Sequence, residues 1–130
     1  MKYPKGFTVI ELIVVLLLVS VGFGLFITQK SSIDASARDT TRKVAINAMY
    51  YNLEEVYYAQ KGYYPQTIDS KTLRAMDPAL FTDPHGNKLG DALSDYHYEG
   101  TDCSTEGACK HYTLTAGLER EAEYKKASRR

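Results

Sequence analysis

A single charged residue, Glu11, interrupts a predominantly apolar run of 21 residues from Phe7 to Ile27. A carboxylate in the interior of a membrane costs roughly 2.5–3.5 kcal/mol on insertion scales, so such a residue is usually paired with an opposite charge. No Lys, Arg or His lies within two helical turns on the C-terminal side of Glu11, and Lys5 lies six positions upstream. We therefore expect the partner of Glu11 to come from outside its own chain.

The rest of the composition points away from catalysis and from nucleic acid. No nucleophile, base and orienting group stand at a spacing that indicates catalysis, so we predict that the protein is not an enzyme. The 16 basic and 16 acidic residues cancel, so no specific nucleic-acid site is evident. Eleven tyrosines without a tryptophan suit surfaces that pack on other subunits. A chain of 130 residues is expected to form one domain.

The apolar run from Phe7 to Ile27 is long enough, as a helix, to cross a bilayer core of about 30 Å. We weighed a cleaved secretory signal ending at Ala35-Ser36-Ala37, but the run exceeds the roughly 7–15 apolar residues of such signals. A plain membrane anchor explains every residue except Glu11. A buried core helix is excluded, because the remaining chain cannot cover so long an apolar rod.

The residues Lys5-Gly6-Phe7-Thr8-Val9-Ile10-Glu11-Leu12-Ile13-Val14-Val15 resemble the class III leader of type IV prepilins and pseudopilins. The resemblance implies that a prepilin peptidase cuts the leader, residues 1–6, after Gly6 and methylates the new amino group of Phe7. Glu11 then becomes the fifth residue of the mature chain. In the family this glutamate meets the N-terminal amine of a neighbouring subunit, which implies a role for Glu11 in subunit assembly.

The same resemblance implies a structural subunit of a type IV pilus or related filament that serves adhesion, twitching motility or DNA uptake. Its expected partners are further copies of itself in a homo-oligomeric filament, the prepilin peptidase, an inner-membrane platform protein and a cytoplasmic assembly ATPase. The expected location is the cytoplasmic membrane, in a single pass, before assembly and an extracellular or periplasmic filament afterwards.

Two alternatives remain open at this stage. The first is a major pseudopilin of type II secretion, favoured by the Tyr64-Pro65 step and by the turn at 83–86. The second is a membrane-anchored binding module that keeps an uncut N-terminal helix.

The expected fold is α+β and type IV pilin-like, with a long N-terminal helix packed on a small antiparallel sheet. Its transmembrane or filament-core part covers 7–27 and its amphipathic continuation covers 28–61, because Ile46, Met49 and Leu53 recur at helical spacing. Lys61-Gly62 provides a stop signal. The remaining residues, 62–130, should form a globular β domain with strands at 96–98 and 111–115, a short helix at 70–76, and a helix or frayed tail at 119–130.

Cys103 and Cys109, with five residues between them, are the only cysteines. Export to an oxidising compartment, which the resemblance implies, favours a disulfide between them. Two free buried thiols were weighed as an alternative, as was a zinc site completed by His97 and His111.

A stretch rich in acidic residues raises the question of a bound cation. Some pseudopilins hold calcium in the corresponding loop, and Asp91, Asp95 and Asp102 are the candidate ligands here. Their spacing is not that of an EF-hand, and a solvated acidic loop is the alternative. No other cofactor is expected. His85 is expected to be a surface residue of its turn.

Overall fold

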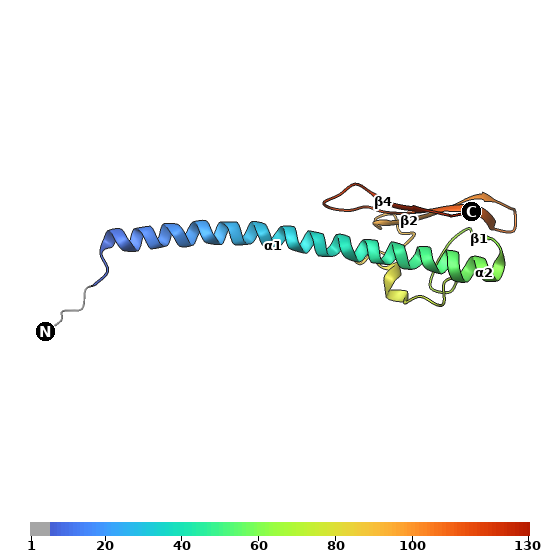
Figure 1. Ribbon diagram of the computed structural model, residues 1–130, viewed down its shortest axis with the longest axis horizontal. Helices are drawn as coiled ribbons and strands as arrows, with labels where there is room; N and C mark the ends of the chain where they lie inside the picture. The colour runs from blue at the N-terminus through green and yellow to red at the C-terminus, as the bar shows by residue number, and fades with distance from the viewer. Residues whose placement is uncertain (1–5) are drawn as a thin grey trace. The chain divides into compact units, whose positions relative to one another are not determined.

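The computed structural model describes residues 6–130, so residues 1–5 of the expected leader lie outside the described part (Figure 1). The chain divides into two compact units, residues up to Ala35 and Ser36–Arg130. The elements follow in the order α1 (Val9–Tyr51), η1 (Asn52–Tyr57), α2 (Tyr58–Lys61), β1 (Tyr64–Pro65), η2 (Pro78–Phe81), β2 (Tyr96–Cys103), β3 (Ala108–Ala116) and β4 (Tyr124–Ala127). The predicted α+β class, one long helix with a small antiparallel sheet, is confirmed.

Helix α1 begins with a local capping interaction. The backbone N–H of Glu11 donates to the Thr8 side-chain Oγ1 at 3.3 Å, and that of Leu12 donates to the Thr8 carbonyl at 3.1 Å. Threonine followed three positions later by glutamate is the sequence pattern of a capping box. The sequence predicted that the helix begins at Phe7, but it begins two residues later, at Val9.

The part of α1 in the first unit leaves its large apolar side chains exposed. Phe7 is 76% exposed, and the described helix up to Ile27 buries none of its apolar residues. This helix is the one in the described chain that is long and apolar enough, by length and composition, to cross a membrane. A helix that is apolar all round needs lipid or other protein to cover it.

In the second unit, the same helix turns one face to a protein core. Ala45, Ile46, Met49 and Leu53 are almost completely buried, at spacings of one, three and four residues that place them on a single stripe. The sequence predicted this face. The helical segment ends at Gly62, whose left-handed φ of 75° and N–H bond to the Tyr58 carbonyl at 2.8 Å form the expected stop.

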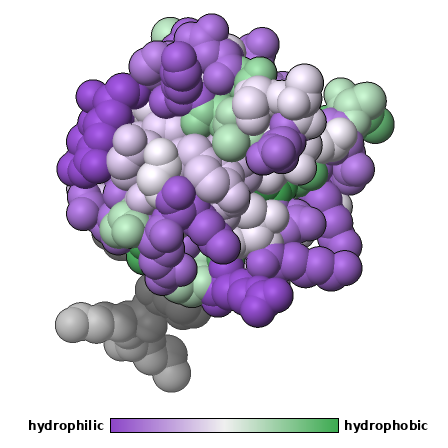
Figure 2. Space-filling view, turned by 90° about the vertical axis from the view of Figure 1, so that its right-hand side faces the viewer, coloured by the Kyte–Doolittle hydropathy of each residue, from purple (hydrophilic) through white to green (hydrophobic). Residues whose placement is uncertain are grey.

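The four strands form one antiparallel sheet with β3 at its centre. β2 pairs with β3 from Tyr96–Ala116 to Cys103–Cys109. On its other edge, β3 pairs with β1 near its start and with β4 near its end. The face of the second unit in Figure 2 is largely hydrophilic, and its apolar residues appear in small separate areas.

Two predictions about the loops and the C-terminal segment are wrong. Residues 70–76 form turns instead of a helix. The Asp69 side chain caps a single turn by accepting the N–H groups of Lys71 and Thr72, and this turn is not extended, with Pro78 close behind it. The helical turn comes at η2 instead, where the Asp77 side chain accepts the N–H of Ala79. Residues 119–130 contain strand β4 and no helix.

The strands and tyrosines also differ from the prediction. The predicted strands at 96–98 and 111–115 are parts of longer ones, because β2 and β3 continue to the tight connection at 104–107. Three tyrosines expected to suit subunit surfaces, Tyr64, Tyr96 and Tyr112, lie in the core.

The disulfide at the end of this hairpin explains a glycine in β2. Cys103 and Cys109 face each other across β2 and β3 and are bonded. A Cβ on Gly100 would lie 2.8 Å from the Cys109 sulfur and 3.2 Å from the Pro65 carbonyl oxygen. The disulfide sulfur and the Pro65 carbonyl therefore occupy the space that a side chain at position 100 would need.

We predict that Gly100→Ala lowers the free energy of unfolding by about 1–3 kcal/mol, the usual cost of overpacking. Denaturant unfolding of the full chain in detergent micelles measures it. Gly117→Ala is the matched control, because the nearest atom to its added Cβ lies at 4.0 Å. Equal stability of the two variants would contradict the steric argument.

Candidate functional site

The predicted processing site lies just before α1. Gly6, Phe7 and Thr8 have no regular secondary structure and are exposed, and a Cβ on Gly6 would meet nothing within 4 Å. The Gly6–Phe7 peptide bond is thus in an exposed segment without regular structure, as a protease substrate requires. Cleavage after Gly6 and methylation of Phe7 remain predictions.

Glu11 lies in the first turn of α1 and is exposed within the first unit. An acidic residue there interacts favourably with the helix dipole by roughly 0.3–1 kcal/mol. That is smaller than the roughly 2.5–3.5 kcal/mol cost of a charged residue in a membrane. The helix end alone therefore does not offset the burial of Glu11.

A buried arginine organises the second unit. Arg42 of α1 is 1% exposed. Its Nε and Nη2 donate to Asp95 Oδ2 at 2.9 and 2.8 Å, and its Nη1 donates to Asp39 Oδ1 at 2.9 Å and to Glu119 Oε1 at 3.0 Å. The three carboxylates come from α1, from the residue before β2 and from the segment between β3 and β4. One guanidinium thus joins three parts of the chain.

Asp39 extends this network to the backbone of the C-terminal segment. Its two oxygens accept the N–H groups of Glu119 at 2.8 Å and Arg120 at 2.9 Å. Burial raises the pKa of Asp39, but these two bonds and the charge of Arg42 outweigh it, so the pKa lies below its ordinary value. Asp39 is therefore held as a carboxylate.

Glu119 is held from two sides. Arg38 donates from Nε and Nη2 to its two oxygens at 2.8 and 2.7 Å, which is a bidentate pair. The bonds from Arg38, with a further one from Arg42, lower the pKa of Glu119 to about 2. Desolvation raises this pKa, but its effect is smaller. Two residues after Glu119 in the sequence, Glu121 forms a surface ion pair, with its Oε2 2.7 Å from Lys43 Nζ.

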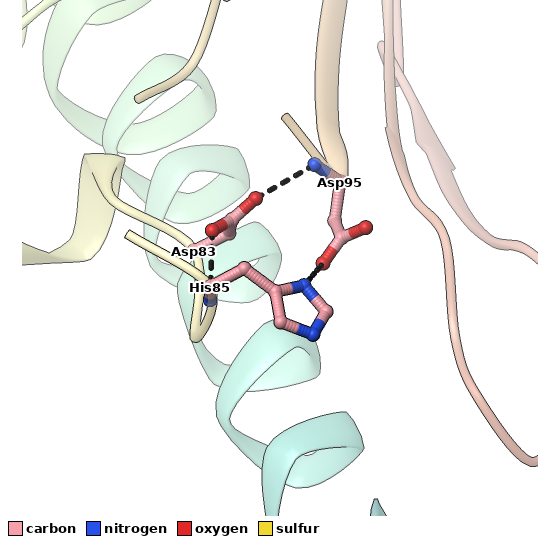
Figure 3. Close-up of side chains that lie close together, drawn as sticks. All are labelled: Asp83, His85 and Asp95. Carbon is pink, nitrogen blue, oxygen red and sulfur yellow. Dashed lines mark hydrogen bonds and ion pairs between the residues drawn. The ribbon is translucent and has the colours of Figure 1, made fainter. Parts of the chain in front are cut away.

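Asp83 organises the loop that delivers Asp95 to the arginine. Its Oδ1 accepts the N–H groups of His85 and Asn87, and its Oδ2 accepts that of Asp95, all at 2.9 Å (Figure 3). Burial raises the pKa of Asp83, but these backbone bonds outweigh it and the pKa is lowered. The Asp-Pro-His-Gly turn predicted from the sequence is thus closed by its own first side chain.

Asp83, His85 and Asp95 form the one group in the described chain with three ligand atoms within 4.8 Å of one another. His85 Nδ1 lies 3.2 Å from Asp95 Oδ2 (Figure 3). It also lies 3.5 Å from Arg42 Nη2. Each Asp83 oxygen already accepts a backbone N–H, and Asp95 Oδ2 accepts two bonds from the guanidinium. The guanidinium of Arg42 therefore already supplies the positive charge that this cluster needs. His85 is half exposed, as expected for its turn.

The structure does not gather the three candidate calcium ligands. Asp95 faces Arg42, and Asp91 accepts the N–H of Lys88 at 3.0 Å in its own loop. Asp102 lies near the end of β2, with a positive φ of 52° and its Oδ2 3.9 Å from His111 Nε2. Calcium binding by these residues stays a prediction that the geometry does not favour.

The predicted disulfide between Cys103 and Cys109 is confirmed. The alternatives of two free thiols and of a zinc site are therefore wrong, because no thiolate is left to bind a metal.

A second buried acid, Glu54, lies in the π-helical segment η1. It is 2% exposed and accepts the hydroxyl groups of Tyr64 and Tyr112, the latter at 2.9 Å, and the N–H of Arg129 at 3.2 Å. Burial, followed by the Glu54 bond, raises the pKa of both tyrosines, so they remain neutral donors. The end of the chain beyond β4 is thereby fixed to the helix.

Sequence reasoning found neither Arg42 nor Glu54. Asp39 lies three residues before Arg42, and Arg42 lies four residues before Ile46, so both belong to the helical stripe that continues to Met49. Their place on this apolar face was a usable signal for a buried ion pair. Glu54 had no such signal, because it follows buried Leu53 directly and enters the core only through the wider π-helical turn.

Residues 1–27 match the family model of the prokaryotic N-terminal methylation motif, which is the class III leader of type IV pilins and pseudopilins. Comparisons with curated proteins and with solved structures find no match. The motif, the exposed apolar helix and the α+β arrangement together support a filament subunit of the pilin or pseudopilin type, with a membrane-anchored precursor.

We predict that Arg42→Gln lowers the free energy of unfolding by about 3–5 kcal/mol, because buried carboxylates lose their compensating charge. Denaturant unfolding of the full chain in micelles measures the loss. Lys43→Gln, which breaks the adjacent surface pair, should cost less than about 1 kcal/mol. A loss for Arg42→Gln as small as that of the control would show that the network contributes little.

The low pKa of Glu119 predicts acid sensitivity. A carboxylate whose pKa is about 2 in the folded chain, against an ordinary 4.5, contributes stability above pH 4.5 that is lost as the pH falls toward 2. Glu119→Gln should therefore lose less stability than the native chain between pH 4.5 and 2. Melting temperatures across this range test it, and parallel pH curves for the two proteins would contradict it.

Proposed function

We propose that the protein is a structural subunit of a type IV pilus or related filament, cut after Gly6, N-methylated at Phe7 and assembled through its N-terminal helix. The observation that carries the proposal is the methylation motif at residues 1–27, placed on a helix whose apolar side chains nothing in the described chain covers. Lipid covers them before assembly, and the helices of other subunits cover them in the filament. Adhesion, twitching motility or DNA uptake is the task that such a filament serves.

The charge of Glu11 gives the assembly its register. Opposite charges about 4 Å apart attract by about 4 kcal/mol at an effective dielectric of 20. The new amine at Phe7 of a neighbouring subunit would therefore offset the cost of burying Glu11. A neighbour shifted along the helix would lose this pair.

The mass of the N-terminal peptide, taken from protein purified out of the cell envelope of its source, tests processing. We expect a peptide that begins with N-methylated Phe7. A peptide that retains Met1 to Gly6 would instead favour the membrane-anchored binding module.

Glu11→Leu should leave membrane insertion intact and abolish or strongly reduce filaments seen by electron microscopy. Ser20→Leu is the matched control, because Ser20 is also polar within the apolar run but bonds to the Leu16 carbonyl of its own helix at 2.8 Å. Filaments at native abundance from Glu11→Leu would refute the register role.

A further inference from the structure

A cavity of about 510 Å³ lies in the second unit, between the end of the long helical segment and the loop that follows β1. Its helical wall is formed by η1 and α2, and its other wall by residues 71–75. Cavities of about 300–1,000 Å³ are typical of small-molecule sites. The cavity is separate from the Arg42 network and from the N-terminal motif, so the proposed function makes no use of it.

The charges around this cavity have one sign. Lys61, Lys71 and Arg74 line it, and no Asp or Glu does. None of the three cations forms an ion pair with another described residue, whereas Arg38, Arg42 and Lys43 all do. Three cations without a direct ion pair at a concave surface favour an anionic ligand.

The acid next to this group is occupied in its own turn. Asp69 Oδ1 accepts the N–H groups of Lys71 and Thr72 and the Thr72 hydroxyl, at 2.9, 2.7 and 2.8 Å. The Thr72 bonds are the main reason for the lowered pKa of Asp69. The nearby charge of Lys71 makes a smaller contribution, but the Lys71 ammonium group forms no direct ion pair with Asp69.

The loop is held in place before any ligand arrives. Arg74 Nε donates to the Lys71 carbonyl at 3.1 Å, which fixes the guanidinium beside Lys71. Ile68, Leu73 and Met76 are buried in the core and anchor the loop on both sides of Arg74. A preorganised guanidinium loses less conformational entropy on binding than a free surface side chain does.

The helical wall adds groups suited to a ring with hydroxyl substituents. Tyr57 is half buried and is packed edge-on against Tyr63, with ring centroids 6.0 Å apart. Asn52 and Gln60 supply side-chain amides, which both donate and accept. Asn52 and Tyr57 are the first and last residues of η1, and π-helical turns occur frequently at functional sites.

We propose that this cavity binds an acidic sugar. Lys61, Lys71 and Arg74 hold its carboxylate or phosphate, and its ring packs on Tyr57. The amides of Asn52 and Gln60 bond to its hydroxyl groups. A bare ion would leave most of the cavity unfilled and would use neither the aromatic ring nor the amides.

Isothermal titration of the full chain in nonionic detergent tests the proposal. The probes are trigalacturonate for a carboxylate source, glucose 6-phosphate for a phosphate source, and maltose as the neutral sugar. At least one acidic probe should bind and maltose should not, and the acidic probe that binds tells which anion the site prefers. Equal binding of maltose, or no binding of either acidic probe, would overturn the proposal.

Paired variants locate the site. Lys71→Gln with Arg74→Gln should weaken the binding of the acidic sugar about tenfold or more, as expected when charged hydrogen bonds are lost. Lys88→Gln with Lys110→Gln removes the same charge from exposed positions outside the cavity and should change the affinity less than twofold. An equal loss in both pairs would reveal a nonspecific charge effect and would overturn the proposal.

Two further variants test the remaining parts of the site: Lys61→Gln tests the third cation, and Tyr57→Leu separates an acidic sugar from other anions. Lys61→Gln, at an exposed residue without an ion pair, should fold normally and still weaken binding, even if the double variant is unstable. Tyr57→Leu should weaken the binding of the sugar severalfold and leave that of inorganic phosphate unchanged. Unchanged sugar binding in Tyr57→Leu would indicate a plain anion site and would overturn the proposal.

A competition experiment tests for nucleic acid. A single-stranded oligonucleotide that binds while acidic sugars fail to displace it would indicate a nucleic-acid site, and this result would also overturn the proposal.

Discussion

The guanidinium of Arg42 is buried at 1% exposure and carries a charge that the fold has to compensate. It does so with Asp39, Asp95 and Glu119, which come from three separate parts of the chain. Residues 66–95 contain little regular structure beyond η2, and the segment between β3 and β4 contains none. These segments owe their positions to their bonds with Arg42 as well as to the core. Moving either segment away would leave a buried guanidinium without one of its partners, and breaking a buried ion pair is strongly destabilising.

Glu54 provides a second polar anchor at the other end of the same helical face. Between Arg42 and Glu54 lies the apolar stripe of Ala45, Ile46, Met49 and Leu53. Apolar packing alone tolerates several ways of placing a helix on a sheet. A shift of the helix by one turn would separate both Arg42 from Asp95 and Glu54 from Tyr112. The two buried polar side chains and their bonds therefore favour one register for the helix on the sheet.

Much of this fold follows from local sequence patterns. The long helix, its stop at Gly62, its apolar stripe and the β2–β3 hairpin depend on periodicity and turn residues that any reader of the sequence can recognise. Strand β4 does not, because its four residues, Tyr124-Lys125-Lys126-Ala127, show no alternation of apolar and polar side chains and its place depends on pairing with β3. The loop at 70–76 contains helix-forming residues, but the turn that Asp69 caps is not extended into a helix before Pro78. The cavity beside it depends on tertiary placement, which no spacing in the sequence reveals.

Three acids on one helical segment show how the two units differ. Asp39 and Glu54 are buried in the second unit, and each accepts bonds from described residues of its own chain. The carboxylate of Glu11 makes no such bond in the described chain, although it lies in the most apolar part of the helix. The second unit thus compensates every acid that it buries, because an uncompensated one would destabilise the fold. An uncompensated Glu11 is consistent with a helix that completes its contacts only beside another subunit, where a free amine at Phe7 would supply the missing charge.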